Sequence, residues 1–150
     1  MSKKTGVLIV NLGTPDSPAT SDVKRYLSEF LNDPRVIDIN PIGRKVLVNG
    51  IIVPTRGPKS AKEYKKLFKI GDGASPLLTY GKNLLKLVRE IGHKQFDVEL
   101  AMRYGNPSMN SILEKMRLAN YDQIIIFPLY PQYASATTGS IIEKAFKIIS

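Results

Sequence analysis

Two tyrosines, an arginine and a hydroxyl-rich run are the chemically most distinctive features of this 150-residue sequence. The arginine is Arg103, and the tyrosines Tyr130 and Tyr133 precede the run Thr137-Thr138-Gly139-Ser140. Aromatic rings stack on flat apolar ligands, a guanidinium pairs with carboxylates, and the N–H groups at a helix N-terminus bind anions. Together these residue types suit a flat aromatic ligand that carries carboxylates, of which a macrocycle is one example.

Each of these positions also has an ordinary structural interpretation. Residues 137–140 have the composition of a helix N-cap, and Tyr130 and Tyr133 are typical of half-buried packing in a loop. A shared ligand site therefore requires that the fold bring these residues together.

Three short apolar runs predict the strands that would do so. They cover residues 7–12, 96–102 and 124–128. Segments with helical spacing separate them, and no hairpin signal joins them. The expected fold class is α/β, a three-layer α/β/α arrangement of the Rossmann type, with an open parallel sheet joined by right-handed crossovers.

Capping residues and apolar periodicity predict the helices. The first begins with Ser17 as its cap and Pro18 at its first helical position, and Asn32-Asp33-Pro34 ends it. The spacing predicts further helices at residues 42–52, 59–70, 76–91 and 108–118, and from 137 onward.

Ligands of open α/β sheets bind beyond the carboxyl ends of the strands. The loops expected there contain residues 13–15, 103–105 and 129–140. These loops hold the arginine, the tyrosines and the hydroxyl-rich run, so we expect them to line one edge of the sheet.

Composition limits the classes of function. The absence of cysteine excludes disulfides, thiolate metal sites, cysteine nucleophiles and iron–sulfur ligation, and fits a cytoplasmic location. No convincing signal peptide or membrane-spanning run is present. The net charge of +9 favours an acidic partner: nucleic acid, an anionic membrane surface, or a small carboxylated or phosphorylated ligand. The lysines themselves are typical of solvated helix faces.

Five short motifs follow one another along the chain. They are Val10–Pro15, Arg56–Lys59, Gly73–Leu77, Met102–Gly105, and Tyr130–Tyr133 with Thr137–Ser140. In this order and spacing they resemble the ferrochelatases, the enzymes that insert ferrous iron into a porphyrin to make haem. The resemblance implies that residues 1–150 form an N-terminal ferrochelatase domain and that the chain stops before the family's C-terminal domain. It also implies that 56–59 is a basic loop.

The resemblance places six residues on porphyrin-pocket positions of the family. They are Leu12, Arg56, Ser75, Arg103, Tyr104 and Tyr130. Arg56 and Ser75 would hold the propionates, Arg103 and Tyr104 would form the pocket wall near the path of the metal, and the other two would pack against the ring.

The chemistry of iron insertion also needs a base and metal ligands. The resemblance implies that a histidine and a glutamate of the C-terminal half supply them. The only histidine here, His93, is interpreted as an exposed residue at a helix end, so no catalytic residue and no metal ligand is predicted within the chain. Ferrous iron and porphyrin would be substrates, with no tightly bound cofactor.

The expected partners are a porphyrin and the missing C-terminal half, without nucleic acid. Peripheral membrane contact and a dimer through exposed surface stay open.

Two other functions compete with this interpretation. A self-contained, homodimeric half-size tetrapyrrole chelatase would need two metal-binding side chains of its own. A non-catalytic basic module for nucleotides or nucleic acid is suggested by the +9 charge and by Gly71-Asp72-Gly73. Those glycines do not follow a strand, and no phosphate-binding-loop lysine is present.

Overall fold

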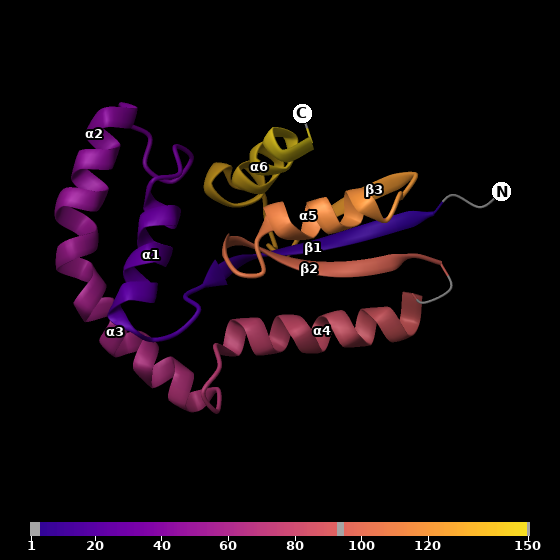
Figure 1. The fold of residues 1–150 in the computed structure, drawn as a ribbon, viewed down its shortest axis with the longest axis horizontal. Helices are drawn as coiled ribbons and strands as arrows, with labels where there is room; N and C mark the ends of the chain where they lie inside the picture. The colour runs from indigo at the N-terminus through magenta and orange to yellow at the C-terminus, as the bar shows by residue number, and fades with distance from the viewer. Residues whose placement is uncertain (1–3, 93–94, 150) are drawn as a thin grey trace.

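A three-stranded parallel sheet lies at the centre of the computed structural model, which describes residues 4–92 and 95–149 (Figure 1). The strands are β1 (Thr5–Thr14), β2 (Asp97–Gly105) and β3 (Gln123–Pro128), in the order β2-β1-β3. Both neighbours pair with β1 in parallel. The predicted fold class and open parallel sheet are confirmed.

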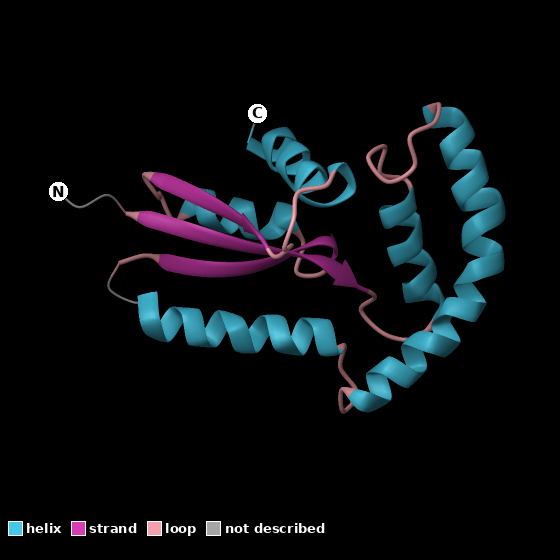
Figure 2. Ribbon diagram, turned by 180° about the vertical axis from the view of Figure 1, so that it is seen from behind, coloured by secondary structure: helices cyan, strands magenta, loops and turns pink. Residues whose placement is uncertain are grey.

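Helices cover both faces of the sheet and extend beyond its carboxyl end. They are α1 (Thr20–Leu31), α2 (Pro41–Lys45), the π-helix η1 (Val46–Ile52), α3 (Val53–Ile70), α4 (Pro76–Gly92), α5 (Met109–Leu118), the π-helix η2 (Ser135–Gly139) and α6 (Ser140–Ile149). Figures 1 and 2 show α4 on one face, α5 and α6 on the other, and α1 to α3 beyond the carboxyl ends of the strands. None of the helices in the described ranges is long and apolar enough to cross a membrane.

The main core lies between the sheet and the α5/α6 layer. Leu8 and Val10 of β1 are fully buried there, against Leu113, Met116 and Ile141. β-branched and aliphatic side chains on a central strand are shielded from water on both faces, which is why residues 7–12 form a near-continuous apolar run.

The segment from 41 to 70 differs from the prediction of two helices separated by a basic loop. It is helical throughout, and Arg56–Lys59 lies within α3. Pro54 falls at the first turn of α3, where the π-helical turn of η1 meets the α-helix and a missing N–H is tolerated. Gly57 faces α1 so closely that a Cβ there would lie 2.6 Å from Lys24 Cγ. Packing on α1 therefore overrides the local Gly-Pro signal.

Two other predicted boundaries were wrong. β2 continues through Arg103-Tyr104-Gly105, which were expected to form a loop, because Tyr104 and Gly105 pair with the end of β1. Helix α1 begins at Thr20 rather than at Pro18. Ser17 instead accepts a hydrogen bond from the Ala19 N–H and donates one to Asp22.

We predict that Gly13→Ala destabilises the fold by about 3 kcal/mol, because Gly13 has a φ of +115° and an added Cβ would lie 1.8 Å from the Tyr104 carbonyl oxygen. Urea unfolding measures the change. The control is Gly43→Ala, because a Cβ added at Gly43 would meet no neighbouring atom within 4 Å. This change should be neutral or stabilising by up to about 1 kcal/mol. Equal stability of the two variants would contradict the close approach of β1 and β2.

Candidate functional site

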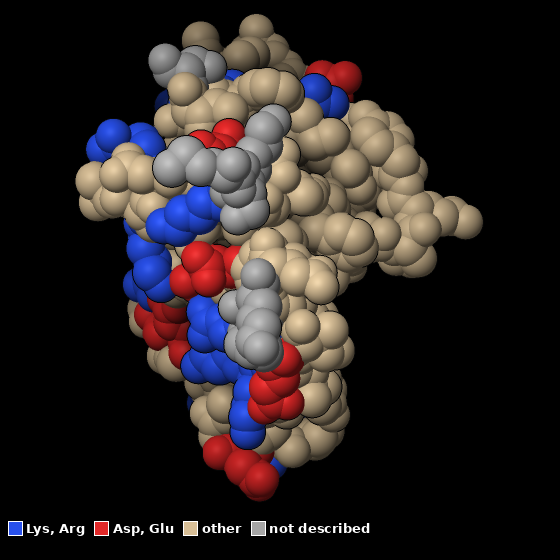
Figure 3. Space-filling view, turned by 90° about the vertical axis from the view of Figure 1, so that its right-hand side faces the viewer, with Lys and Arg blue, Asp and Glu red and all other residues tan. Residues whose placement is uncertain are grey.

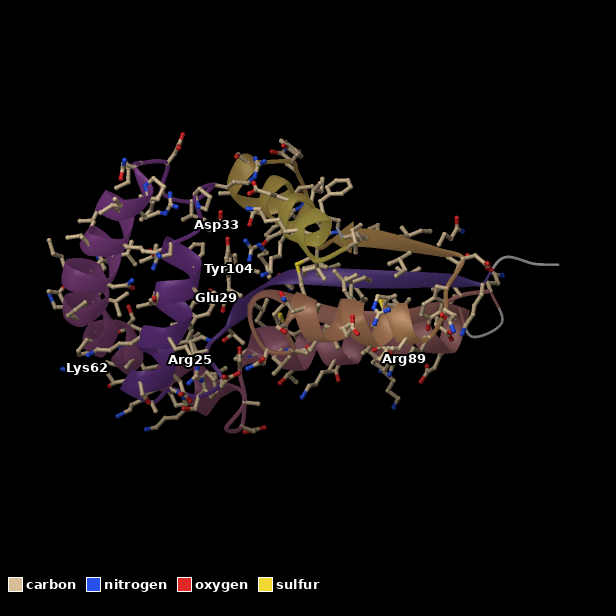
Figure 4. The ribbon with its side chains drawn as sticks, turned by 45° about the horizontal axis from the view of Figure 1, so that its top comes forward. Arg25, Glu29, Asp33, Lys62, Arg89 and Tyr104 are labelled. Atoms are coloured by element: carbon tan, nitrogen blue, oxygen red, sulfur yellow. The ribbon has the colours of Figure 1, made fainter. Side chains whose placement is uncertain are left out.

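A buried carboxylate links three separate elements at the carboxyl edge of the sheet. Asp33, just after α1, accepts hydrogen bonds at Oδ2 from Arg103 Nη2 (2.5 Å), Tyr104 Oη (2.8 Å) and Ser140 Oγ (2.6 Å). Its side chain is 5% exposed and that of Arg103 is 12% exposed. Figure 4 shows Asp33 and Tyr104 close together between α1 and the sheet. We call Asp33, Arg103, Tyr104 and Ser140 the Asp33 cluster.

The protonation states of this cluster follow from its contacts. Burial raises the pKa of Asp33, but hydrogen bonds from Ser140, the Arg35 N–H and Tyr104, with the charge of Arg103, outweigh it and hold that pKa below its ordinary value. Burial raises the pKa of Tyr104, and the neighbouring carboxylate adds to the rise. Asp33 is therefore a charged acceptor, and Tyr104 a neutral donor.

Arg103 is held from three sides. Besides its ion pair with Asp33, its Nε donates to Ser140 Oγ at 2.7 Å, and its guanidinium carbon lies 4.4 Å from the centre of the Tyr104 ring. It lines a cleft of about 470 Å³ between α1, η1 and α6, into which Lys45 and Lys144 also face. Glu29 and Glu143 line the same cleft, so Arg103 is a guanidinium fixed by its ion pair in a wall that carries both signs of charge.

Tyr130, two residues after β3, carries a hydroxyl without a partner. The side chain packs against the α5/α6 core, yet its buried Oη finds no hydrogen-bond partner among residues 4–92 and 95–149. Burial raises its pKa, and Arg103 lies near enough to lower it in part. A buried hydroxyl without a partner costs about 1–3 kcal/mol, so this position suits a ligand that accepts or donates a hydrogen bond.

The order of the strands gives this edge its significance. β1 is central. The connection from β1 to β2 leads to one side of it and the connection from β2 to β3 leads back past it to the other side, so the strand order switches between β1 and β3. Ligands of open α/β sheets bind in the crevice at such a switch point. Leu12 lies near the end of β1, and the segment leading to Tyr130 continues along β1 through the bond from Leu129 N to Val10 O. The predicted meeting of these loops at one edge is confirmed.

The six residues predicted for the porphyrin pocket fall into two groups. Leu12, Arg103, Tyr104 and Tyr130 come together at the carboxyl edge, although Tyr104 is fully buried beneath Arg103.

The other two predicted pocket residues lie on helix α3 and in the turn that follows it. Arg56 is exposed on α3, and Ser75 is buried in the turn between α3 and α4. Neither side chain hydrogen-bonds to the Asp33 cluster, so their predicted role with propionates stays a prediction.

His93 lies outside the described residues. Within the described ranges, no three carboxylate or histidine side chains are grouped to hold a metal ion.

Sequence reasoning missed Asp33 and Ser140 as members of the site. Asp33 was interpreted only as a helix stop. Ser140 was considered only within the run 137–140, as part of an anion-binding helix N-terminus or of a cap, and not as a partner of Asp33. They lie 107 residues apart, and Asp33 lies 70 residues from Arg103. The position of the Asp33 carboxylate at a predicted helix end was the one available signal, and it does not identify a partner.

The parallel sheet with helices on both faces defines an open α/β protein. The Ferrochelatase family model matches residues 4–150, so the chain belongs to the ferrochelatase family. The match confirms the resemblance found in the five motifs.

Three curated relatives, each named Ferrochelatase, show how far the similarity extends. The protein of Francisella tularensis subsp. tularensis is 44% identical over 148 residues, and that of subsp. novicida is 43% identical over 148 residues. In both comparisons the alignment covers 98% of this chain and 44% of the relative. The protein of Chromobacterium violaceum is 42% identical over 151 residues, covering 98% of this chain and 41% of the relative. The chain thus spans less than half the length of these relatives.

We predict that Asp33→Asn lowers the free energy of unfolding by about 3 kcal/mol at pH 7, because it removes the charged partner of a buried guanidinium. Since the pKa of Asp33 is lowered on folding, its contribution is complete above the ordinary carboxyl pKa of about 4 and is lost as the pH falls through the folded-state value. Urea unfolding of both proteins between pH 7 and pH 3 should show the difference shrinking at the acid end. A difference that does not change with pH would contradict this assignment.

Proposed function

We propose that this chain is the porphyrin-binding half of an enzyme that inserts ferrous iron into a porphyrin to make haem. The proposed pocket is the crevice at the carboxyl ends of β1 and β3. The observation that carries the proposal is the pair formed by a fixed guanidinium, Arg103, and a buried hydroxyl without a partner, Tyr130 Oη, at the switch point of the sheet. Membership of the ferrochelatase family supports the choice of ligand.

Each pocket residue has a distinct proposed role. Leu12 and Tyr130 pack against the macrocycle, which is flat and apolar on its faces. Arg103 borders the ring near the path of the metal, and Asp33 keeps its guanidinium from swinging into solvent. Tyr104 acts through Arg103, since its own side chain is fully buried.

The propionates are proposed to bind Arg56 and Ser75. Arg56 is exposed and has no ion-pair partner in the part of the chain that the structure describes, so its charge is available to a carboxylate. A planar guanidinium forms two parallel hydrogen bonds with such a group.

The proposed division of labour leaves the metal chemistry to residues beyond this chain. Removal of the pyrrole protons needs a base, and delivery of ferrous iron needs imidazole or carboxylate ligands. We propose that the part of the family not spanned here supplies them, that the chain alone does not insert iron, and that the protein works in the cytoplasm.

We predict that a free-base porphyrin titrated into the chain shows a perturbed absorbance spectrum, and that Arg103→Ala weakens this binding at least about tenfold, because it removes the guanidinium that borders the ring at the pocket wall. The matched control is Arg117→Ala, because Arg117 is exposed on α5 and its ion-pair partner within residues 4–92 and 95–149 is the neighbouring Glu114. Equal affinity of the wild-type and Arg103→Ala chains, both shown to be folded by circular dichroism, would contradict the proposed pocket.

The hydroxyl of Tyr130 allows a second test with opposite effects on stability and binding. Tyr130→Phe should stabilise the ligand-free chain by about 1 kcal/mol, because it removes a buried polar group without a partner. The same change should weaken porphyrin binding several-fold if the ligand satisfies that hydroxyl. Thermal unfolding and the absorbance titration measure the two effects. A variant that is destabilised, or that binds porphyrin as tightly as the wild type, would count against this role of Tyr130.

A further inference from the structure

One face of the sheet is only partly covered. Along β3, Ile124 and Ile126 face the α5/α6 core, whereas Ile125 and Phe127 point to the opposite face and are 48% and 57% exposed. The helix on that face, α4, contacts β2 and β1. Figure 2, viewed from behind, shows the strands in front of α5 with α4 below them and no helix over β3.

Helix α4 carries two neighbouring apolar rows. One row faces the sheet: Gly81 lies against Leu100, and Gly92 lies against Phe96. The second row contains residues one position earlier in the sequence, spaced by four, three and four residues, and between 36% and 82% exposed. It consists of Tyr80, Leu84, Leu87 and Ile91.

The connection between β1 and β2 fixes the direction in which the second row points. Such parallel crossovers are right-handed, and α4 returns antiparallel to the strands (Figure 1). A residue one position before a sheet-facing residue is rotated by about 100° around the helix axis. With this geometry the rotation turns the second row toward β3. The row and the bare face of β3 therefore form one concave apolar surface.

We call this surface the α4–β3 groove. It consists of Tyr80, Leu84, Leu87, Ile91, Ile125 and Phe127. Figure 3 looks along the sheet from the amino ends of the strands, and charged side chains gather on one side while most of the other side is free of them. An exposed apolar surface of this kind marks an interaction site.

The shape of the groove specifies its occupant. Its two walls, a helix flank and a sheet face, meet at an angle, so a single helix about 10 Å wide fits between them if it is apolar on two adjoining sides. A second copy of this chain is a poor match. Its own α4 presents Asn83, Lys86 and Glu90 on the side opposite its sheet, and these polar groups would be brought onto Phe127.

We propose that the α4–β3 groove binds an apolar-faced helix supplied by the part of a ferrochelatase that this chain does not span. The relatives have further sequence that can supply such a helix, because the matched region is only 44% of the Francisella protein. This inference rests on the proposed function in one respect, that the chain works together with the remainder of the family's length. The inference adds a docking surface for the rest of the protein, and this surface lies away from the proposed porphyrin pocket.

Cysteine labelling tests the groove, because the chain contains no cysteine of its own. Leu87→Cys is placed in the isolated chain and in a chimera in which this chain replaces the matched 148 residues of the Francisella tularensis relative. The folded proteins are labelled with a maleimide, and mass spectrometry of the digested protein measures the rate of labelling at position 87. That rate should be at least about tenfold lower in the chimera than in the isolated chain. Leu118→Cys, on α5 and 66% exposed, is the control and should react equally in both. Equal labelling at position 87 would overturn the proposal.

A second measurement applies to the isolated chain and does not depend on the chimera. The double change Leu84→Lys and Leu87→Lys should reduce binding of a hydrophobic fluorescent dye and leave the unfolding temperature unchanged, because these side chains are exposed when the groove is empty. Strong destabilisation, or unchanged dye binding, would overturn the proposal. Iron insertion by the chimera tests the proposed function separately, since protection at position 87 without insertion would refute that function and retain the groove.

Discussion

The carboxylate of Asp33 is the interaction on which the carboxyl edge of this molecule depends. One oxygen accepts three hydrogen bonds, from β2 twice and from the start of α6 once, while the other accepts the N–H of Arg35. A buried charge is tolerated only when it is paired and fully hydrogen-bonded. The same contacts that satisfy Asp33 therefore hold α1, β2 and α6 in one arrangement and aim Arg103 at the cleft.

The sheet divides its surroundings into a polar edge and an apolar face. At the carboxyl ends of the strands, backbone polar groups and the Asp33 cluster create a place for a ligand with charge and hydrogen-bonding capacity. The opposite face of β3 exposes Ile125 and Phe127, with Gln123 at its amino end, and is the proposed docking surface for another part of the polypeptide. Because the two surfaces belong to the same strands, ligand binding and docking of the remaining polypeptide would share one rigid support.

The sequence allowed a good prediction of the fold and a partial prediction of the site. Strands such as 124–128 were found because buried parallel strands read as unbroken apolar runs. The basic loop that the resemblance implied at 56–59 was wrong, since the π-helical turn η1 leads directly into α3 and Gly57 packs closely on α1 within that helix. Arg103 was predicted in a loop, although β2 continues through it. The reason is that the pairing of Tyr104 with Gly13 of β1 extends the strand, and the local sequence does not show this pairing.

The site residues also divide into those that the sequence identified and those that it did not. Arg103 and Tyr130 were identifiable because their chemistry is unusual and because they follow or end a predicted strand. Asp33 was not, since its partners lie 70 to 107 residues away and no local pattern encodes such a contact. Pairings of this kind become visible only when the chain is folded.

The most direct test of the central claim is an anaerobic insertion assay with the isolated chain. A free-base porphyrin is bound first, ferrous iron or zinc is added, and conversion to the metalloporphyrin is followed by absorbance against a protein-free control. The account predicts a bound, spectrally perturbed porphyrin and no insertion above the protein-free rate. Catalysed insertion by this chain alone would contradict the account and would favour a self-contained half-size chelatase.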